Sequence, residues 1–155
     1  MPGWIRLLVR LVTAIWCRSV ETVGVQHVPR GVPLIVVANH ENGLIDPLLI
    51  ASRLPVAPRF LAKSTLWKNP VLRFLFWLGR VVPVHRKQDA AEGADMKKNV
   101  EMFEIAGAVL AKKGVLALFP EGQSHNEPEL QPLKTGAARI CLAAHESTRI
   151  LPVGI

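Results

Sequence analysis

The sequence predicts an α/β domain with a mixed, mostly parallel sheet flanked by helices. Two short apolar runs, at 34–38 and 115–119, each stop abruptly on polar residues, as buried strands do where they leave a sheet. Longer segments with helical spacing lie between the strand candidates, which is typical of an α/β fold. The 155 residues, 50% of them hydrophobic, are enough for one domain with a buried core.

Residues 1–19 are predicted to form an interfacial helix on a membrane surface. Positions 4–18 carry three arginines and no acidic residue among mainly apolar side chains. The longest uncharged run, 11–17, is far shorter than the roughly 20 residues that span a bilayer, and no signal-peptide pattern occurs. Arginine and tryptophan suit the headgroup level of a membrane, with leucine and isoleucine beneath it. The alternative is a helix that packs on its own domain.

Residues 20–155 form the predicted main domain, which begins with a short edge strand and turn at 20–30. The first core strand, 34–38, follows. Pro47 then suits the first turn of the next helix, because proline lacks the backbone N–H that is unused there. A second short strand is predicted at 59–62.

A basic and aromatic stretch follows. Residues 47–88 contain eight lysines and arginines and no acidic residue. Within it, 66–78 is apolar nearly all round, which predicts a helix that is either buried in the core or in contact with lipid or an acyl chain. The net charge of +7 indicates an anionic partner. Nucleic acid is not expected, because the basic residues are interleaved with apolar ones and no nucleic-acid-binding motif occurs.

The remaining elements complete a sheet with flanking helices. Residues 80–84 are predicted to be a strand that leads to Arg86, whose guanidinium group suits a phosphate. Apolar positions three and four apart predict an amphipathic helix at 96–112. A small-residue helix at 136–144 and a last strand at 149–153 follow.

The main functional signal lies at the end of the 34–38 strand, where His40 precedes Asp46 by six positions. A carboxylate that accepts the second ring proton of a histidine fixes its tautomer and stabilises the imidazolium. The pair is therefore predicted to be a general base with its orienting group. Six residues of regular helix would separate the two side chains, so the chain must turn at Asn42-Gly43. The alternative is a strand end and a helix start without chemistry.

A second polar turn, 120–125, follows the 115–119 strand. Its Glu121 is a candidate acid, base or hydrogen-bond acceptor for a hydroxyl group, with an exposed turn glutamate as the alternative. Gly122 allows close approach of the backbone and can present N–H groups to an anion. Lys134 comes just before a predicted helix N-terminus, which also suits an anion.

Four motifs in one order resemble the glycerolipid acyltransferases, the family of the glycerol-3-phosphate and 1-acylglycerol-3-phosphate acyltransferases. They are Asn39-His40 with Asp46-Pro47, Phe-Pro-Glu-Gly at 119–122, Leu-Lys-Thr-Gly-Ala-Ala-Arg at 133–139, and Leu-Pro-Val-Gly at 151–154. One departure is that five residues, instead of the commoner four, separate His40 from Asp46. A subgroup that includes eukaryotic glycerol-3-phosphate acyltransferases has this longer form with an asparagine that Asn42 matches. This favours a glycerol phosphate acceptor.

The resemblance implies a transferase of phospholipid biosynthesis, which moves a fatty acyl group from coenzyme A or acyl carrier protein to a hydroxyl of glycerol-3-phosphate or its 1-acyl form. His40 is expected to be the general base and Asp46 its orienting group. The residues expected to bind substrate are Arg86, with Arg80 as the alternative, Glu121, Gly122, Ser124 and Lys134. No metal is expected, and no cofactor other than acyl-CoA or acyl-ACP as co-substrate. No nucleophile motif such as G-x-S-x-G occurs, so direct attack by the acceptor is expected.

The resemblance also implies partners, location and extent. The expected partners are an acyl thioester donor, which includes acyl carrier protein, a glycerol phosphate acceptor, and a membrane surface with anionic lipids on the cytoplasmic side. Residues 20–155 would be an acyltransferase domain that is incomplete at its C-terminus, since family members continue past the 151–154 motif. Two rival functions are a non-catalytic lipid- or membrane-binding module of the same fold and a hydrolase that uses the same histidine.

Overall fold

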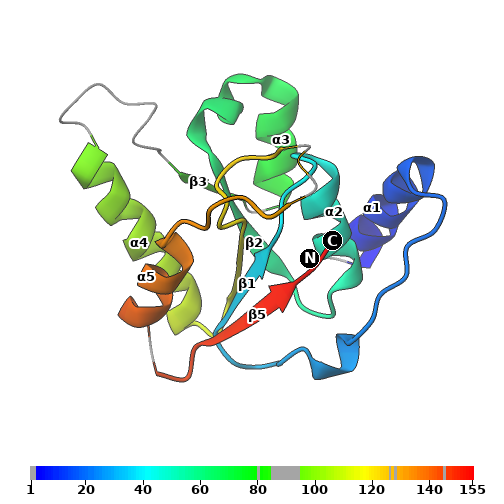
Figure 1. The fold of residues 1–155 in the computed structure, drawn as a ribbon. Helices are drawn as coiled ribbons and strands as arrows, with labels where there is room; N and C mark the ends of the chain where they lie inside the picture. Colours follow the sequence, from blue (N-terminus) through cyan, green and yellow to red (C-terminus); the bar gives the residue numbers. More distant parts are fainter. Residues whose placement is uncertain (1–2, 80, 85–94, 126, 128, 145) are drawn as a thin grey trace.

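A computed structural model describes residues 3–79, 81–84, 95–125, 127, 129–144 and 146–155. It contains one five-stranded sheet with helices on both faces (Figure 1). The strand order is β3-β2-β4-β1-β5, and every pairing that it describes is parallel. The strands are β1 Leu34–Ala38, β2 Pro58–Lys63, β3 Val82–Val84, β4 Val115–Leu118 and β5 Arg149–Val153.

The predicted α/β class is confirmed, and the sheet is more regular than predicted. A mixed sheet would contain at least one antiparallel pair of strands, and none occurs among the described pairings. Between most strands a helix returns the chain to the end of the sheet at which the previous strand began. Such crossover connections produce parallel pairs of strands. In the parallel pair β1 and β4, Leu34 pairs with Val115 and Val37 with Leu118. The segments that follow the two strands therefore begin side by side at the carboxyl ends of the strands.

The core has two halves, one on each face of the sheet. Leu34 and Val36 of β1 pack in one half with α2 (Ile45–Arg53). Ile35 of β1 faces the other half, which includes side chains of α4 (Asp95–Ala111) and α5 (Gly136–Ala143). Both faces of β1 are thus buried, which explains why its sequence is continuously apolar instead of alternating.

The edge strand predicted at 20–30 is wrong. The segment contains the short 3-10 helix η1 (Val25–His27) and pairs with none of the strands that the structure describes. Gly24 before it has φ +78°, which interrupts an extended conformation. The position beside β1 is taken by β5, from the other end of the chain, so residues 20–30 do not pair with β1.

The apolar helix predicted at 66–78 is divided in two. The 3-10 helix η2 (Ser64–Lys68) comes first, and α3 (Pro70–Leu78) follows. Between them, the Asn69 side chain accepts the backbone N–H groups of Val71 and Leu72, and Pro70 occupies the first turn of α3. A capping asparagine followed by a proline starts a new helix at this point. The prediction of one continuous helix relied on the apolar residues and overlooked this signal.

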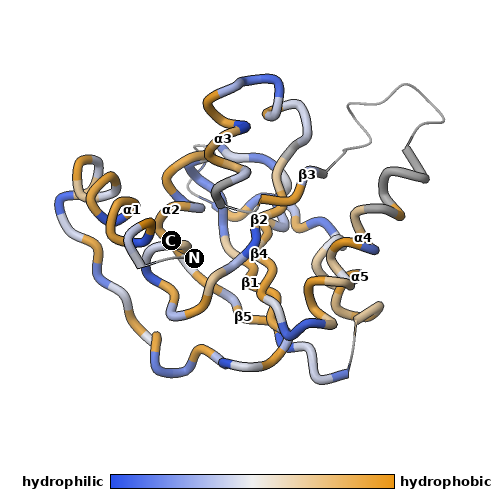
Figure 2. The backbone as a smooth tube through the Cα atoms, turned by 180° about the vertical axis from the view of Figure 1, so that it is seen from behind, coloured by the Kyte–Doolittle hydropathy of each residue, from blue (hydrophilic) through white to orange (hydrophobic). Residues whose placement is uncertain are grey.

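The N-terminal helix α1 (Gly3–Trp16) has two different faces. One face packs on α2: Thr13 is buried, and Arg10 Nε donates a hydrogen bond of 3.1 Å to the Ser52 carbonyl. The other face exposes the apolar side chains of Trp4, Leu7, Leu8, Leu11, Ile15 and Trp16. Much of α1 has the hydrophobic colour in Figure 2. None of the helices described here is long and apolar enough to cross a membrane. The helix therefore packs on its own domain and still presents an apolar surface.

Candidate active site

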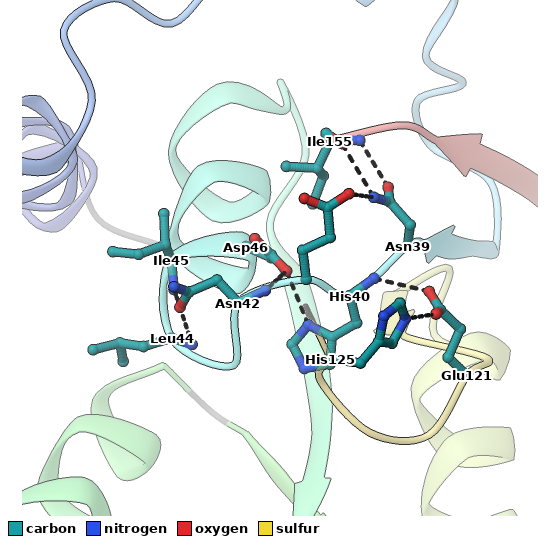
Figure 3. Close-up of polar contacts among 10 residues, drawn as sticks. Asn39, His40, Asn42, Leu44, Ile45, Asp46, Glu121, His125 and Ile155 are labelled. Carbon is teal, nitrogen blue, oxygen red and sulfur yellow. Dashed lines mark hydrogen bonds and ion pairs between the residues drawn. The ribbon is translucent and has the colours of Figure 1, made fainter. Parts of the chain in front are cut away.

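The candidate site lies at the carboxyl ends of β1 and β4. His40 follows β1 by two residues, and the segment 119–125, called here the 119–125 turn, follows β4 directly. Because the two strands are parallel neighbours, the sheet brings His40 and this turn together across about 80 residues of sequence, as Figure 3 shows for Glu121 and His125. The carboxyl ends of parallel strands are where ligands are usually bound in such folds.

The structure brings His40 and Asp46 into contact. His40 Nδ1 lies 3.1 Å from Asp46 Oδ2, and the Asp46 carboxylate is buried (Figure 3). The same oxygen accepts the Asn42 backbone N–H at 2.7 Å, while the Asn42 side chain accepts the N–H groups of Leu44 and Ile45. Asn42 thus forms the predicted turn and orients the carboxylate. A histidine held through Nδ1 keeps Nε2 for a substrate proton.

Phe119 fixes the plane of the His40 ring. The two rings are stacked, with centroids 3.8 Å apart and an interplanar angle of 10°. Phe60 of β2 lies behind Phe119, with centroids 6.4 Å apart. The imidazole is therefore restrained by a hydrogen bond at one edge and a stacked ring on one face, which leaves few rotations open to it.

Glu121 is buried and binds protein groups. Its Oε1 accepts the His40 backbone N–H at 2.9 Å, and its Oε2 accepts the Gln131 N–H at 3.2 Å and pairs with His125 Nε2 (Figure 3). Burial raises the pKa of Glu121, but the hydrogen bonds from His125, Gln131 and His40 outweigh it, so the pKa lies below its ordinary value. The alternative of an exposed turn glutamate is wrong. Both carboxylate oxygens of Glu121 thus have protein partners. The predicted contact of Glu121 with substrate stays a prediction.

Gly122 and Lys134 lie next to each other. Gly122 has φ +76°, and a Cβ there would lie only 2.6 Å from Lys134 Nζ. The Lys134 backbone N–H donates to the Pro120 carbonyl at 2.8 Å, which ties the lysine to the turn. The absence of a side chain at Gly122 therefore makes room for the Lys134 ammonium group. This positive charge lies next to the 119–125 turn.

The other predicted binding residues are only partly placed. Ser124 is exposed, and its Oγ lies 3.3 Å from the position of a Cβ on Gly43, in the loop between His40 and Asp46. Ser124 thus borders the site. Arg86 and its alternative Arg80 lie outside the described residues, so their predicted role stays a prediction.

Sequence reasoning missed the roles of Phe119, His125 and Asn39. The Asn39 side chain exchanges two hydrogen bonds with the Ile155 backbone, of 2.8 and 3.1 Å, and so joins the ends of β1 and β5 (Figure 3). A histidine four residues after a glutamate was a visible signal for the pair of Glu121 and His125. The stack of Phe119 on His40 had no local signal, because it depends on which strands are neighbours.

A cavity of about 420 Å³ lies beside the site. Apolar residues at the ends of β1 and β5 line it, together with Glu121 and His125, but His40 and Asp46 do not. The cavity thus adjoins the 119–125 turn and the two residues on either side of His40, Asn39 and Glu41. Within the described part of the chain, no group of three or more His, Cys, Asp or Glu residues is placed to hold a metal ion.

The fold and the histidine–aspartate pair define an α/β protein whose site is suited to proton abstraction from a hydroxyl group. A family model described as Acyltransferase matches residues 19–155, and the chain belongs to this family. The resemblance drawn from the four motifs is thus confirmed at the level of the family.

Several curated proteins are similar to the chain. The 1-acyl-sn-glycerol-3-phosphate acyltransferase alpha of Homo sapiens is 28% identical over 151 residues, which cover 96% of this chain and 50% of that protein. The N-acylphosphatidylethanolamine synthase of Arabidopsis thaliana is 28% identical over 138 residues, 83% of this chain and 46% of that protein. Glycerol-3-phosphate O-acyltransferase 2 of Saccharomyces cerevisiae is 36% identical over 62 residues, 40% of this chain and 8% of that protein.

The chain spans about half the length of the first of these relatives. No solved structure matches the chain significantly. The relatives' names agree on acyl transfer in glycerolipid chemistry and differ in the acceptor, so the acceptor of this chain is a matter for the proposal below.

Proposed function

We propose that this protein transfers a fatty acyl group from a thioester, on coenzyme A or acyl carrier protein, to a hydroxyl of glycerol-3-phosphate or 1-acylglycerol-3-phosphate. The observation that carries the proposal is the contact of 3.1 Å between His40 Nδ1 and Asp46 Oδ2 at the carboxyl end of a parallel strand. The names of the human and yeast relatives support these two acceptors.

In the proposed reaction, His40 is the general base. Its Nε2 takes the proton of the acceptor hydroxyl while the oxygen attacks the thioester carbonyl, and Asp46 stabilises the resulting imidazolium. The new C–O bond forms, the C–S bond breaks, and the imidazolium returns its proton to the leaving thiolate. A positioned base typically accelerates such a step by about 10²- to 10⁴-fold.

The surroundings of His40 support this role. The ring is already oriented by Asp46 and stacked on Phe119, so little reorganisation is required when the acceptor arrives. No nucleophilic serine or cysteine motif occurs in the sequence, which favours direct attack over an acyl-enzyme.

One cation beside the site and the net charge of the chain support anionic substrates. Lys134 Nζ stands over Gly122 in the turn that follows β4, close to the segment that holds His40. The net charge of +7 has the sign needed to attract both a glycerol phosphate and the phosphates of an acyl donor. Arg86 belongs to the proposed phosphate site by its place after β3 in the sequence.

We also propose that the protein works at a membrane surface, on the cytoplasmic side. The exposed face of α1 carries tryptophan, leucine and isoleucine side chains, as a helix lying at a lipid interface does. Helix α3 adds a second set of exposed apolar side chains, made of Val71, Phe74, Leu75 and Trp77. Anionic lipids are the proposed partners of the arginines on α1.

An assay with a fluorescent acyl-CoA tests the activity. The donor is incubated with glycerol-3-phosphate, 1-acylglycerol-3-phosphate, phosphatidylethanolamine or no acceptor, and the products are identified by mass spectrometry. We expect acylated product with one of the two glycerol phosphates and loss of product in His40→Ala. Free fatty acid without an acceptor would indicate a hydrolase. Lipid binding without any turnover would indicate the non-catalytic module.

A further inference from the structure

The 119–125 turn holds the backbone of His40 as well as its ring. Glu121 Oε1 accepts the His40 N–H at 2.9 Å, and the His125 N–H donates to the His40 carbonyl at 3.2 Å. Both backbone groups of the candidate base are therefore bound by one short segment. A small movement of this segment would displace the imidazole with it.

We propose that His125 is a positioning residue for the acyl transfer, which locks the Glu121 carboxylate in the orientation that holds His40. This inference rests on the proposed function and assigns it a further residue. His125 Nε2 pairs with Glu121 Oε2, the oxygen that does not bind His40 (Figure 3). The ring thus acts on His40 through the carboxylate.

Burial makes this contact consequential. The Glu121 side chain is fully buried, and 11% of the His125 side chain is exposed. Without the imidazole, Oε2 would keep only the Gln131 N–H at 3.2 Å among its described partners. A buried carboxylate that loses its partner is left with an uncompensated charge, which rotation towards other donors or water would relieve. Rotation would carry Oε1 away from the His40 N–H.

The contacts of His125 distinguish it from a second base. Its Nε2 is engaged by Glu121, and its Nδ1 is buried without a hydrogen-bond partner among the described residues. Asp46, which orients the ring of His40, binds His40 Nδ1 and the Asn42 N–H, whereas the described ion pair of His125 is with Glu121. The two residues therefore act on different parts of His40, one on the ring and one on the backbone.

The test compares His125→Leu, which has no donor, with His125→Gln, whose amide can still donate to Glu121. His27→Leu is the matched control, because His27 is an exposed histidine on η1. For each protein we would measure kcat and KM with acyl-CoA and both glycerol phosphates, the melting temperature by circular dichroism, and the His40 tautomer by long-range ¹H–¹⁵N spectra.

We expect His125→Leu to lower kcat by about 10²-fold, the effect of a displacement of roughly 1 Å, with KM little changed. His125→Gln should restore most of the activity, and His27→Leu should behave as wild type. In wild type the spectra should show His40 with its proton on Nδ1. In His125→Leu they should show a mixture of tautomers, because a displaced His40 ring loses its hydrogen bond to Asp46. Unchanged kcat and an unchanged tautomer in His125→Leu would overturn the proposal.

Two further outcomes are also decisive. If wild type transfers no acyl group, the proposed function fails, and the spectra of His40 still decide whether His125 positions it. If His125→Leu does not fold, His125→Asn replaces it, since its amide is one methylene shorter than that of glutamine and stops short of Glu121. Equal kcat for the glutamine and asparagine variants would then overturn the positioning role.

Discussion

The imidazole of His40 lies flat on the phenyl ring of Phe119, with centroids 3.8 Å apart and planes inclined by 10°. The two residues come from the ends of different strands, β1 and β4. The stack therefore exists only because these strands are neighbours in the sheet, and it makes Phe119 part of the support of the proposed base.

Phe119→Leu should lower kcat while the fold is retained. An aromatic pair typically contributes about 0.5–1.5 kcal/mol, which corresponds to roughly 2- to 12-fold in rate if the stack is needed in the transition state. Phe60→Leu is the control, because Phe60 is buried next to Phe119 without a recorded contact to His40. Equal kcat values for Phe119→Leu and Phe60→Leu would show that the stack of Phe119 on His40 does not contribute to catalysis.

His40→Ala and Asp46→Asn should each lower kcat by about 10²- to 10⁴-fold. The first removes the base, and the second removes the charge that stabilises the imidazolium and selects the tautomer with Nδ1 protonated. Steady-state kinetics with circular dichroism as the folding control measure both effects. A folded His40→Ala variant with wild-type turnover would refute the assignment of the base.

Gly122→Ala should raise the KM for the phosphate-bearing acceptor. Its φ of +76° makes any side chain unfavourable, and the new Cβ would also displace Lys134 Nζ, 2.6 Å away. Gly31→Ala separates the two effects, because Gly31 has φ +73° and nothing within 4 Å of its Cβ position. Both variants should lose about 1 kcal/mol of stability or more. A raised KM in both would show that backbone strain, and not Lys134, is responsible.

Glu121→Gln should flatten the dependence of stability on pH in the acid range. The pKa of Glu121 is lowered from 4.5 in the folded state, so its contribution to the free energy of unfolding is present above about pH 4.5 and is lost as the pH falls through the folded pKa. Urea unfolding of both proteins from about pH 6 downward measures this. Parallel curves for the two proteins would contradict the lowered pKa.

Replacing Trp4 and Trp16 by alanine should weaken binding to vesicles. Both are exposed on α1, with 63% and 70% of their surface accessible. Binding of wild type should increase with anionic lipid and decrease with salt, since each cation near such a surface contributes about 1 kcal/mol that ions screen. Leu142→Ala is the control, as Leu142 is also largely exposed, at 86%, and lies on α5, across the sheet. Equal binding to neutral and anionic vesicles would refute the electrostatic part.

Local patterns in the sequence were enough to predict two core strands and the position of the candidate base. Continuous apolar runs predicted β1 and β4, because a strand buried on both faces needs such a run. The polar residues that end these runs marked His40 and Glu121 as candidates. Motif order was sufficient for the family, which the match over residues 19–155 confirmed.

How these parts meet depends on the order of the strands in the sheet. A local pattern reports whether a residue is buried, but it does not report its neighbour across the sheet. The order β3-β2-β4-β1-β5 places β5 where a strand at 20–30 was predicted, and it sets the 119–125 turn against His40. For the same reason a glutamate that suits an exposed turn is buried here, since it binds the backbone of a residue 81 positions earlier.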